Sequence, residues 1–168
     1  MRSQKLLLCS LALFCVGISF GCKKLSENSV TVPEPYQSWL AGYFDALKAK
    51  DTEKLKDLSG RLSARDQKRM PANTQEMMRD SRKKIFSQVL DTIGQKYGEF
   101  QSYSVVSCKV TPVAMGSAAA DMIGEGDHLE IICKSKYSNA TVAERFVLYK
   151  GPEDPEVVME AHSVTASP

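Results

Sequence analysis

Two histidines and their acidic neighbours are the side chains of this chain that could transfer a proton. His162 follows Glu160 by two residues in a segment that reads as a strand, which would place both side chains on one face. A carboxylate beside an imidazole can tune a general acid or base. His128 follows Asp127 at the expected start of another strand. A histidine facing solvent fits these positions equally well, so we keep the three as candidates and expect no catalytic residue.

The signatures of the common enzyme and cofactor-binding classes are missing from the sequence. It has no serine nucleophile elbow, no HExxH zinc motif, no phosphate-binding loop and no Rossmann glycine fingerprint. Cys108, Cys133 and His128 lack the short spacing typical of zinc ligands. We therefore expect no metal, no cofactor and a domain that is not an enzyme.

Five cysteines are encoded, and Cys108 and Cys133 form an even pair in the second half of the chain. Both lie in segments that read as strands. A hairpin centred near Ala120 and Asp121 would place one cysteine opposite the other, and a disulfide between them would contribute about 3 kcal/mol in the chain-entropy model. Two buried free thiols are the alternative. We expect the disulfide, and an even pair of cysteines in an exported domain indicates an oxidising compartment.

The first 21 residues have the layout of a secretory signal peptide. Arg2 and Lys5 give a basic start, and an apolar run from Leu6 to Phe20 follows. This run is shorter than the roughly 20 residues that a membrane-spanning helix needs, and Lys23 and Lys24 come directly after it. We expect the segment to be removed on export.

Gly21 and Cys22 resemble the end of a bacterial lipobox, although Ser19 and Phe20 replace its usual Leu and small residue. The resemblance implies a bacterial lipoprotein of the cell envelope, lipidated at Cys22 and anchored in the membrane by that lipid. Lys23, in place of Asp, implies the outer membrane, with the domain facing the periplasm. The alternative is an ordinary signal peptide that leaves Cys22 free. Residues 22–35 then read as a flexible tether.

The length and the net charge of the chain are those expected for one ordinary globular domain, residues 36–166. The formal net charge of +2 gives no argument for a nucleic-acid partner. Basic residues outnumber acidic ones up to Gly98, and acidic residues outnumber basic ones after it. The two halves either attract each other or face solvent separately.

The first half of the domain has helical periodicity. Tyr36, Trp39, Tyr43 and Phe44 form an aromatic stripe that could line a ligand pocket or an interface, or pack in the core. A short helix follows, with Asp51 as its N-cap. After Pro71 a long helix runs from about Thr74 to about Tyr97 and ends at Gly98.

The second half alternates apolar and polar residues, as strands do. We expect strands over 100–115, 128–137, 141–150 and 156–166, with a strong turn at 151–155. Helices followed by consecutive strands predict an α+β domain, in which N-terminal helices pack on a curved, cone-like antiparallel four-strand meander.

This order of elements resembles the cone-shaped fold of the nuclear-transport-factor-2-like and cystatin-like superfamilies, over residues 34–166. Small exported bacterial proteins of that class are particularly similar. The resemblance implies a pocket between helices and sheet, and functions that range from ligand binding to dimerisation and catalysis. Enzymes of the class use an Asp or His inside the cone, which adds Asp45 and Asp91 to the candidates.

Three functions are compatible with these observations. The leading hypothesis is a non-enzymatic, lipid-anchored domain that binds a small apolar ligand or another envelope protein. The second is a small enzyme for hydration, dehydration or isomerisation. The third is a structural homodimer formed through an apolar sheet face. An apolar pocket favours the first, an ionisable pair at the bottom of the pocket the second, and outward Val and Ile the third.

Overall fold

The computed structural model describes residues 30–166. The predicted signal peptide, Cys22 and the first part of the tether lie outside the described residues. Within 30–166, no helix is both long and apolar enough to cross a membrane.

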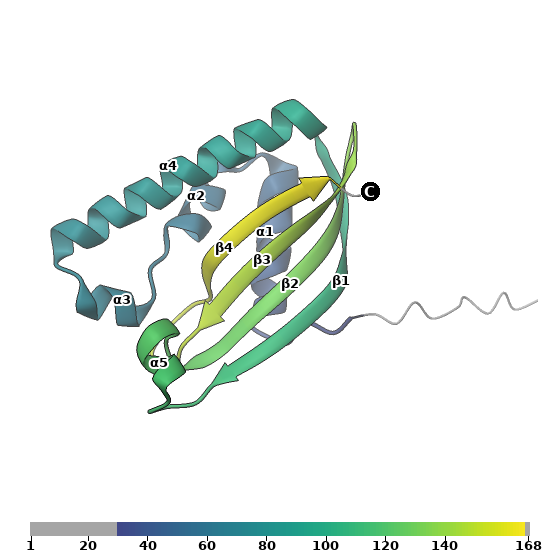
Figure 1. The fold of residues 1–168 in the computed structure, drawn as a ribbon. Coiled ribbons are helices and arrows are strands. Elements are labelled where there is room, and N and C mark those ends of the chain that lie inside the picture. Colours follow the sequence, from purple (N-terminus) through teal and green to yellow (C-terminus); the bar gives the residue numbers. More distant parts are fainter. Residues whose placement is uncertain (1–29, 167–168) are drawn as a thin grey trace, which may run out of the picture.

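Four helices precede the sheet (Figure 1). They are α1 (Tyr36–Ala49), α2 (Thr52–Gly60), α3 (Ala64–Arg69) and α4 (Ala72–Tyr97). The predicted N-cap of α2 is confirmed, because Asp51 Oδ1 accepts a hydrogen bond from the Lys54 amide at 3.0 Å. The short helix α3 was not predicted from the sequence, although Ser63 caps it through the amide of Asp66. Gly98, with φ of +81°, ends α4 as predicted.

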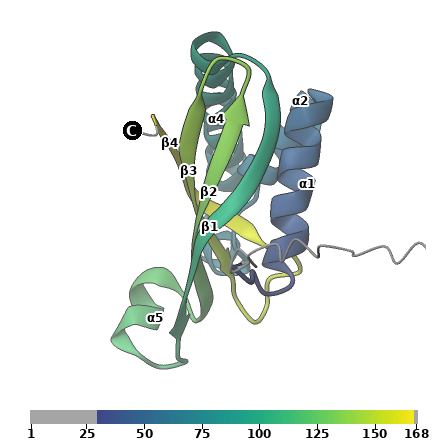
Figure 2. The same cartoon turned by 90° about the vertical axis from the view of Figure 1, so that its right-hand side faces the viewer.

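The strands form an open antiparallel meander in the order β1-β2-β3-β4 (Figure 1). Their bounds are β1 (Phe100–Val113), β2 (Gly126–Tyr137), β3 (Thr141–Lys150) and β4 (Val158–Ala166). The predicted α+β class and the four-strand meander are therefore confirmed. A further short helix, α5 (Ala118–Ile123), stands where we expected a hairpin turn. Figure 2 shows α5 at one end of the sheet, on the side away from α1.

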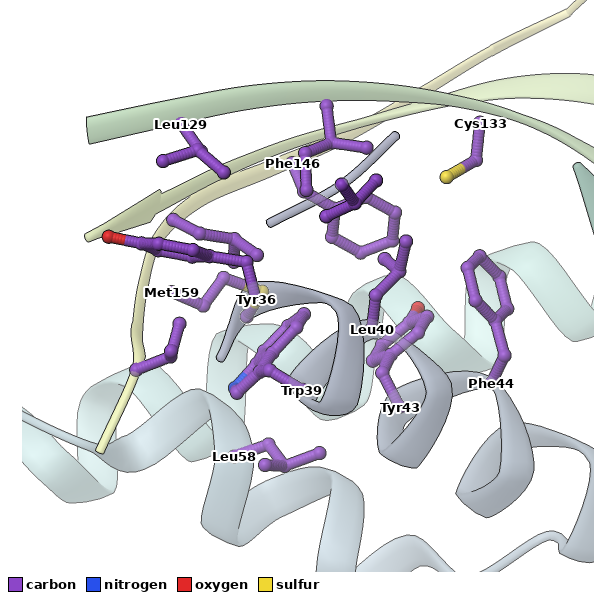
Figure 3. Close-up of a cluster of buried hydrophobic side chains, with 14 of the residues drawn as sticks. Tyr36, Trp39, Leu40, Tyr43, Phe44, Leu58, Leu129, Cys133, Phe146 and Met159 are labelled. Atoms are coloured by element: carbon purple, nitrogen blue, oxygen red, sulfur yellow. The ribbon is translucent and has the colours of Figure 1, made fainter. Parts of the chain in front are cut away.

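The main core lies between α1, α2 and the inner face of the sheet (Figure 3). Its centre is an aromatic cluster around Phe146, whose ring centroid lies 5.0 Å from that of Tyr43 and 6.0 Å from that of Trp39. Phe44 joins the same cluster. Inner positions of β2 and β3 supply the aliphatic part, notably Leu129, Ile131 and Leu148. The alternation of these strands thus faces its apolar side to the helices.

Candidate functional site

A cavity of about 450 Å³ lies where α1 and α4 end and β1 begins. This volume is within the range of small-molecule sites. Its inner wall is largely apolar and comes from five elements. The apolar and aromatic lining residues are Leu47, Leu55, Leu90, Ile93, Phe100 and Tyr137.

Two chain reversals place these side chains around one space. Lys50 takes a left-handed conformation, with φ of 57°, and its amide bonds to the Leu47 carbonyl, which ends α1 beside the cavity. Gly98 ends α4 and lets Phe100 begin β1 on the other side. Gly94 also lines the cavity, and a Cβ atom built on it would meet no atom within 4 Å. This side of the cavity therefore has room for a larger side chain.

An ion pair marks the rim of the cavity. Lys50 Nζ lies 2.5 Å from Glu99 Oε1, and both side chains are exposed. The hydrogen bond and the charge of Lys50 lower the pKa of the Glu99 carboxyl. Solvent screens such an exposed pair, so it adds polarity at the rim without closing it.

Behind the Tyr137 wall lies a buried polar cluster around Glu144, whose exposed fraction is 0%. The Tyr137 hydroxyl donates to Glu144 Oε1 at 2.8 Å, and the Tyr43 hydroxyl reaches Oε2 at 3.5 Å. His162 Nε2 lies 3.0 Å from the same Oε2. The other ring nitrogen, His162 Nδ1, has no hydrogen-bond partner among residues 30–166.

This arrangement leaves the tyrosines as neutral donors. Burial, followed by the charge of Glu144, raises the pKa of both Tyr43 and Tyr137. Of the cluster, Tyr137 is the member that lines the cavity, and its hydroxyl proton is already engaged by the carboxylate. The imidazole and the carboxylate stand behind it, out of reach of a molecule in the cavity.

The predicted Glu160–His162 pair is wrong. Glu160 instead lies 3.2 Å from His128 Nδ1, and His162 pairs with Glu144. The cause is an irregularity in the β3–β4 ladder between Val147 and Leu148, which leaves Glu160 as an extra residue on β4. The expected two-residue alternation is therefore broken at this point.

His128 holds the loop after α5 to the sheet. Its Nε2 faces the Gly124 carbonyl at 3.2 Å, while Nδ1 faces Glu160, and its ring packs on Tyr149. Tyr149 in turn donates to the Glu125 carbonyl. Two buried side chains thus fix two adjacent carbonyls of this loop, at the end of the sheet opposite the cavity.

The remaining predicted site residues are dispersed. Asp91 lies at the rim of the cavity and Asp45 is exposed on α1. Trp39, Tyr43 and Phe44 are buried in the core, and Tyr36 is buried with its hydroxyl on the Asp127 carbonyl. Among residues 30–166, no group of three His, Cys, Asp or Glu side chains could hold a metal ion.

The predicted placement of Cys108 opposite Cys133 is also wrong. Cys108 pairs with Ile131, and Cys133 pairs with Val105, because the turn is not where we expected it and a bulge at Val106 shifts the register. The two cysteines are diagonal neighbours on the inner face, and both are free thiols. Diagonal positions lie about 7–8 Å apart, beyond the usual Cα separation of a disulfide.

We expect the two thiols to differ in reactivity. Burial raises the pKa of Cys133 to about 12, whereas Cys108 is only half-buried. Iodoacetamide at pH 8 should modify Cys108 slowly and Cys133 only after unfolding in urea, as mapped by peptide mass spectrometry. A disulfide between the two cysteines would contradict this expectation. It would appear as a native chain two hydrogens lighter, in which neither cysteine reacts before reduction.

Sequence reasoning missed Glu144 and the cavity. Glu144 had a local signal, because it is a charged residue that alternates with the apolar Val142 and Phe146 at inner positions of β3. The cavity had no local signal in the sequence, because Leu47, Leu90 and Phe100 come together only in the tertiary fold. Comparisons with protein-family models, with curated proteins and with solved structures find no match to this chain.

Proposed function

We propose that this chain is a lipid-anchored envelope protein whose domain binds a small, mainly apolar molecule in the cavity between α1, α4 and β1. The observation that carries the proposal is the apolar lining of a cavity of about 450 Å³. The proposed anchor is a lipid on Cys22. The signal peptide before Cys22 and the tether after it resemble those of a bacterial lipoprotein.

The position of the buried pair Glu144 and His162 favours binding over catalysis. An enzyme of the predicted kind needs its acid or base in contact with the substrate. Glu144 and His162 are buried behind Tyr137 and engaged with each other. In this geometry the cluster supports the cavity wall and offers no free proton acceptor to a ligand.

The outer face of the sheet favours binding over a face-to-face dimer. Its side chains on β1 and β2 are mainly Ser, Lys and Thr, with the exposed ion pair of Glu130 and Arg145 at 2.7 Å. Ile132 and Val147 are its only large aliphatic side chains within the paired positions of β2 and β3 that the structure describes. A broad apolar surface for a sheet-face dimer is therefore not formed there.

Filling the cavity should abolish binding of an apolar probe. Gly94→Phe places a ring at the open side of the cavity, and we expect the affinity for N-phenyl-1-naphthylamine, measured by fluorescence titration, to fall at least tenfold. Gly94→Ala is the matched control, because it removes the same glycine and leaves the space open. Equal probe binding by both variants would show that the probe binds elsewhere.

The anchor is tested separately, by mass spectrometry of the protein extracted from membranes. A mature N-terminus at Cys22 that carries acyl chains is the expected result. An unmodified N-terminus would remove the anchor from the proposal and leave a diffusible binding protein.

A further inference from the structure

The outer edge of β1 is open. Strand β1 stands at one end of the sheet, and within residues 30–166 no further strand pairs with its free side. The opposite edge differs, because Arg82 of α4 donates to the Met159 carbonyl of β4. Open edges template pairing with another chain unless charge, proline or a bulge protects them.

Strand β1 has little of this protection. It is 14 residues long, and Lys109 is its single charged residue. Pro112 protects only the far end. Three large apolar side chains on it are exposed: Val106 at 55%, Val110 at 44% and Tyr103 at 36%. The edge is thus long, nearly uncharged and partly apolar, and a bulge at Val106 interrupts it.

The helices cover the inner face of β1 incompletely. Tyr103, Val105, Cys108 and Val110 lie on this face, opposite Ser135, Cys133, Ile131 and Leu129 of β2. Phe44 of α1 stacks on Tyr103, but Val110 remains exposed. We call these four side chains of β1 the inner row. Another strand paired with the free edge of β1 would cover the exposed part of the inner row.

The inner row is symmetric about the bulge. Antiparallel pairing of two copies about a point between Val106 and Ser107 places Tyr103 opposite Val110, and Val105 opposite Cys108. Each of these is an inner-face position, because the extra residue at the bulge shifts the alternation by one. Both inner rows then lie side by side and bury each other.

The position of the single charged residue of β1 is compatible with the same pairing register. Lys109 would face the second copy's Ser104, so the two lysines avoid each other. Such an interface is isologous, with one patch used twice, and therefore closes as a dimer rather than growing as a fibre.

We infer that β1 pairs antiparallel with β1 of a second copy of this chain, with Ser104 opposite the second copy's Lys109. The two sheets then form one continuous sheet through their edges. The seam spans residues 102–111 and includes neither Phe100 nor Tyr137 of the cavity. Dimerisation and ligand binding can therefore fail independently.

Cysteine crosslinking tests the register. In the full chain in membranes, the double variant Ser104→Cys/Lys109→Cys presents two pairs of facing thiols on the outer side of the seam. We expect a short bis-maleimide to yield a covalent dimer well above the level of the parent chain, which retains its own cysteines. Ser163→Cys/Thr165→Cys places two thiols on exposed positions of β4, at the other edge, and is the control. No dimer, or equal dimer from both edges, would overturn the inference.

A charged substitution in the β1–β1 interface tests the contribution of its apolar side chains. Val110→Lys places an ammonium on the inner row, and we expect at least a tenfold weaker dimer by sedimentation of the full chain in detergent. Ile85→Lys changes an exposed apolar side chain of α4 in the same way, away from the seam, and should leave the dimer intact. Circular dichroism checks that both variants fold, and an unchanged dimer in folded Val110→Lys would overturn the inference.

Discussion

Replacing Glu144 with valine is expected to lower the free energy of unfolding by about 3–5 kcal/mol, because several buried hydrogen bonds lose their shared acceptor at once. The carboxylate is the common acceptor of Tyr137, Tyr43 and His162 in the core. Without it, two buried hydroxyls and an imidazole lose their partner, and each buried unsatisfied group costs about 1–3 kcal/mol. Urea denaturation followed by circular dichroism measures the change.

Two further variants separate the cluster from the strand itself. Glu144→Gln keeps an acceptor oxygen at the same place and should lose less stability than Glu144→Val. Glu130→Val makes the same substitution on the outer face of the neighbouring strand, where Glu130 contacts Arg145 in solvent, and should barely move the urea midpoint. If Glu130→Val destabilised the fold as much as Glu144→Val, the buried cluster would not be the cause.

The sequence was sufficient for the fold class, because periodicity is a local property. The aromatic stripe of α1, the cap at Asp51 and the alternation in β2 and β3 each depend on residues close in the chain. Helices α3 and α5 were missed, since six residues each carry too little periodicity to be distinguished from a turn.

Two local irregularities that the sequence does not mark, the position of a turn and a β-bulge, explain the pairing errors. A single extra residue at Val106 or at Glu160 reverses the face of the residues after it, and no composition signal marks either position. The position of the turn between β1 and β2 separates Cys108 from Cys133, and the bulge at Glu160 separates Glu160 from His162. Register is a tertiary property, set here by the packing of the inner face on α1.

Tyr137 connects the two parts of the candidate site. Its ring forms part of the cavity wall, while its hydroxyl is fixed by Glu144. A wall residue held in this way loses little rotamer freedom when a ligand binds, which favours affinity through preorganisation. The buried cluster thus contributes to binding without contact with the ligand.

Phe146→Ala is expected to lower the free energy of unfolding by about 3–5 kcal/mol, as is typical for a large buried ring. Phe146 is fully buried, and its ring packs against Trp39, Tyr43 and His162. The loss would open a void between α1 and the sheet that the surrounding rings fill only in part. Urea denaturation gives the magnitude, and Trp39, the single tryptophan, should report the void as a shift of its emission.

The adjacent residue offers the matched control, because Val147 faces the other side of the same strand. Val147→Ala removes a partly covered side chain from the outer face and should cost clearly less than Phe146→Ala, with unchanged Trp39 emission. Equal losses for the two variants would place the main core on the wrong face of β3. That outcome would also undermine the inner row of β1, whose assignment depends on the same ladder through β2.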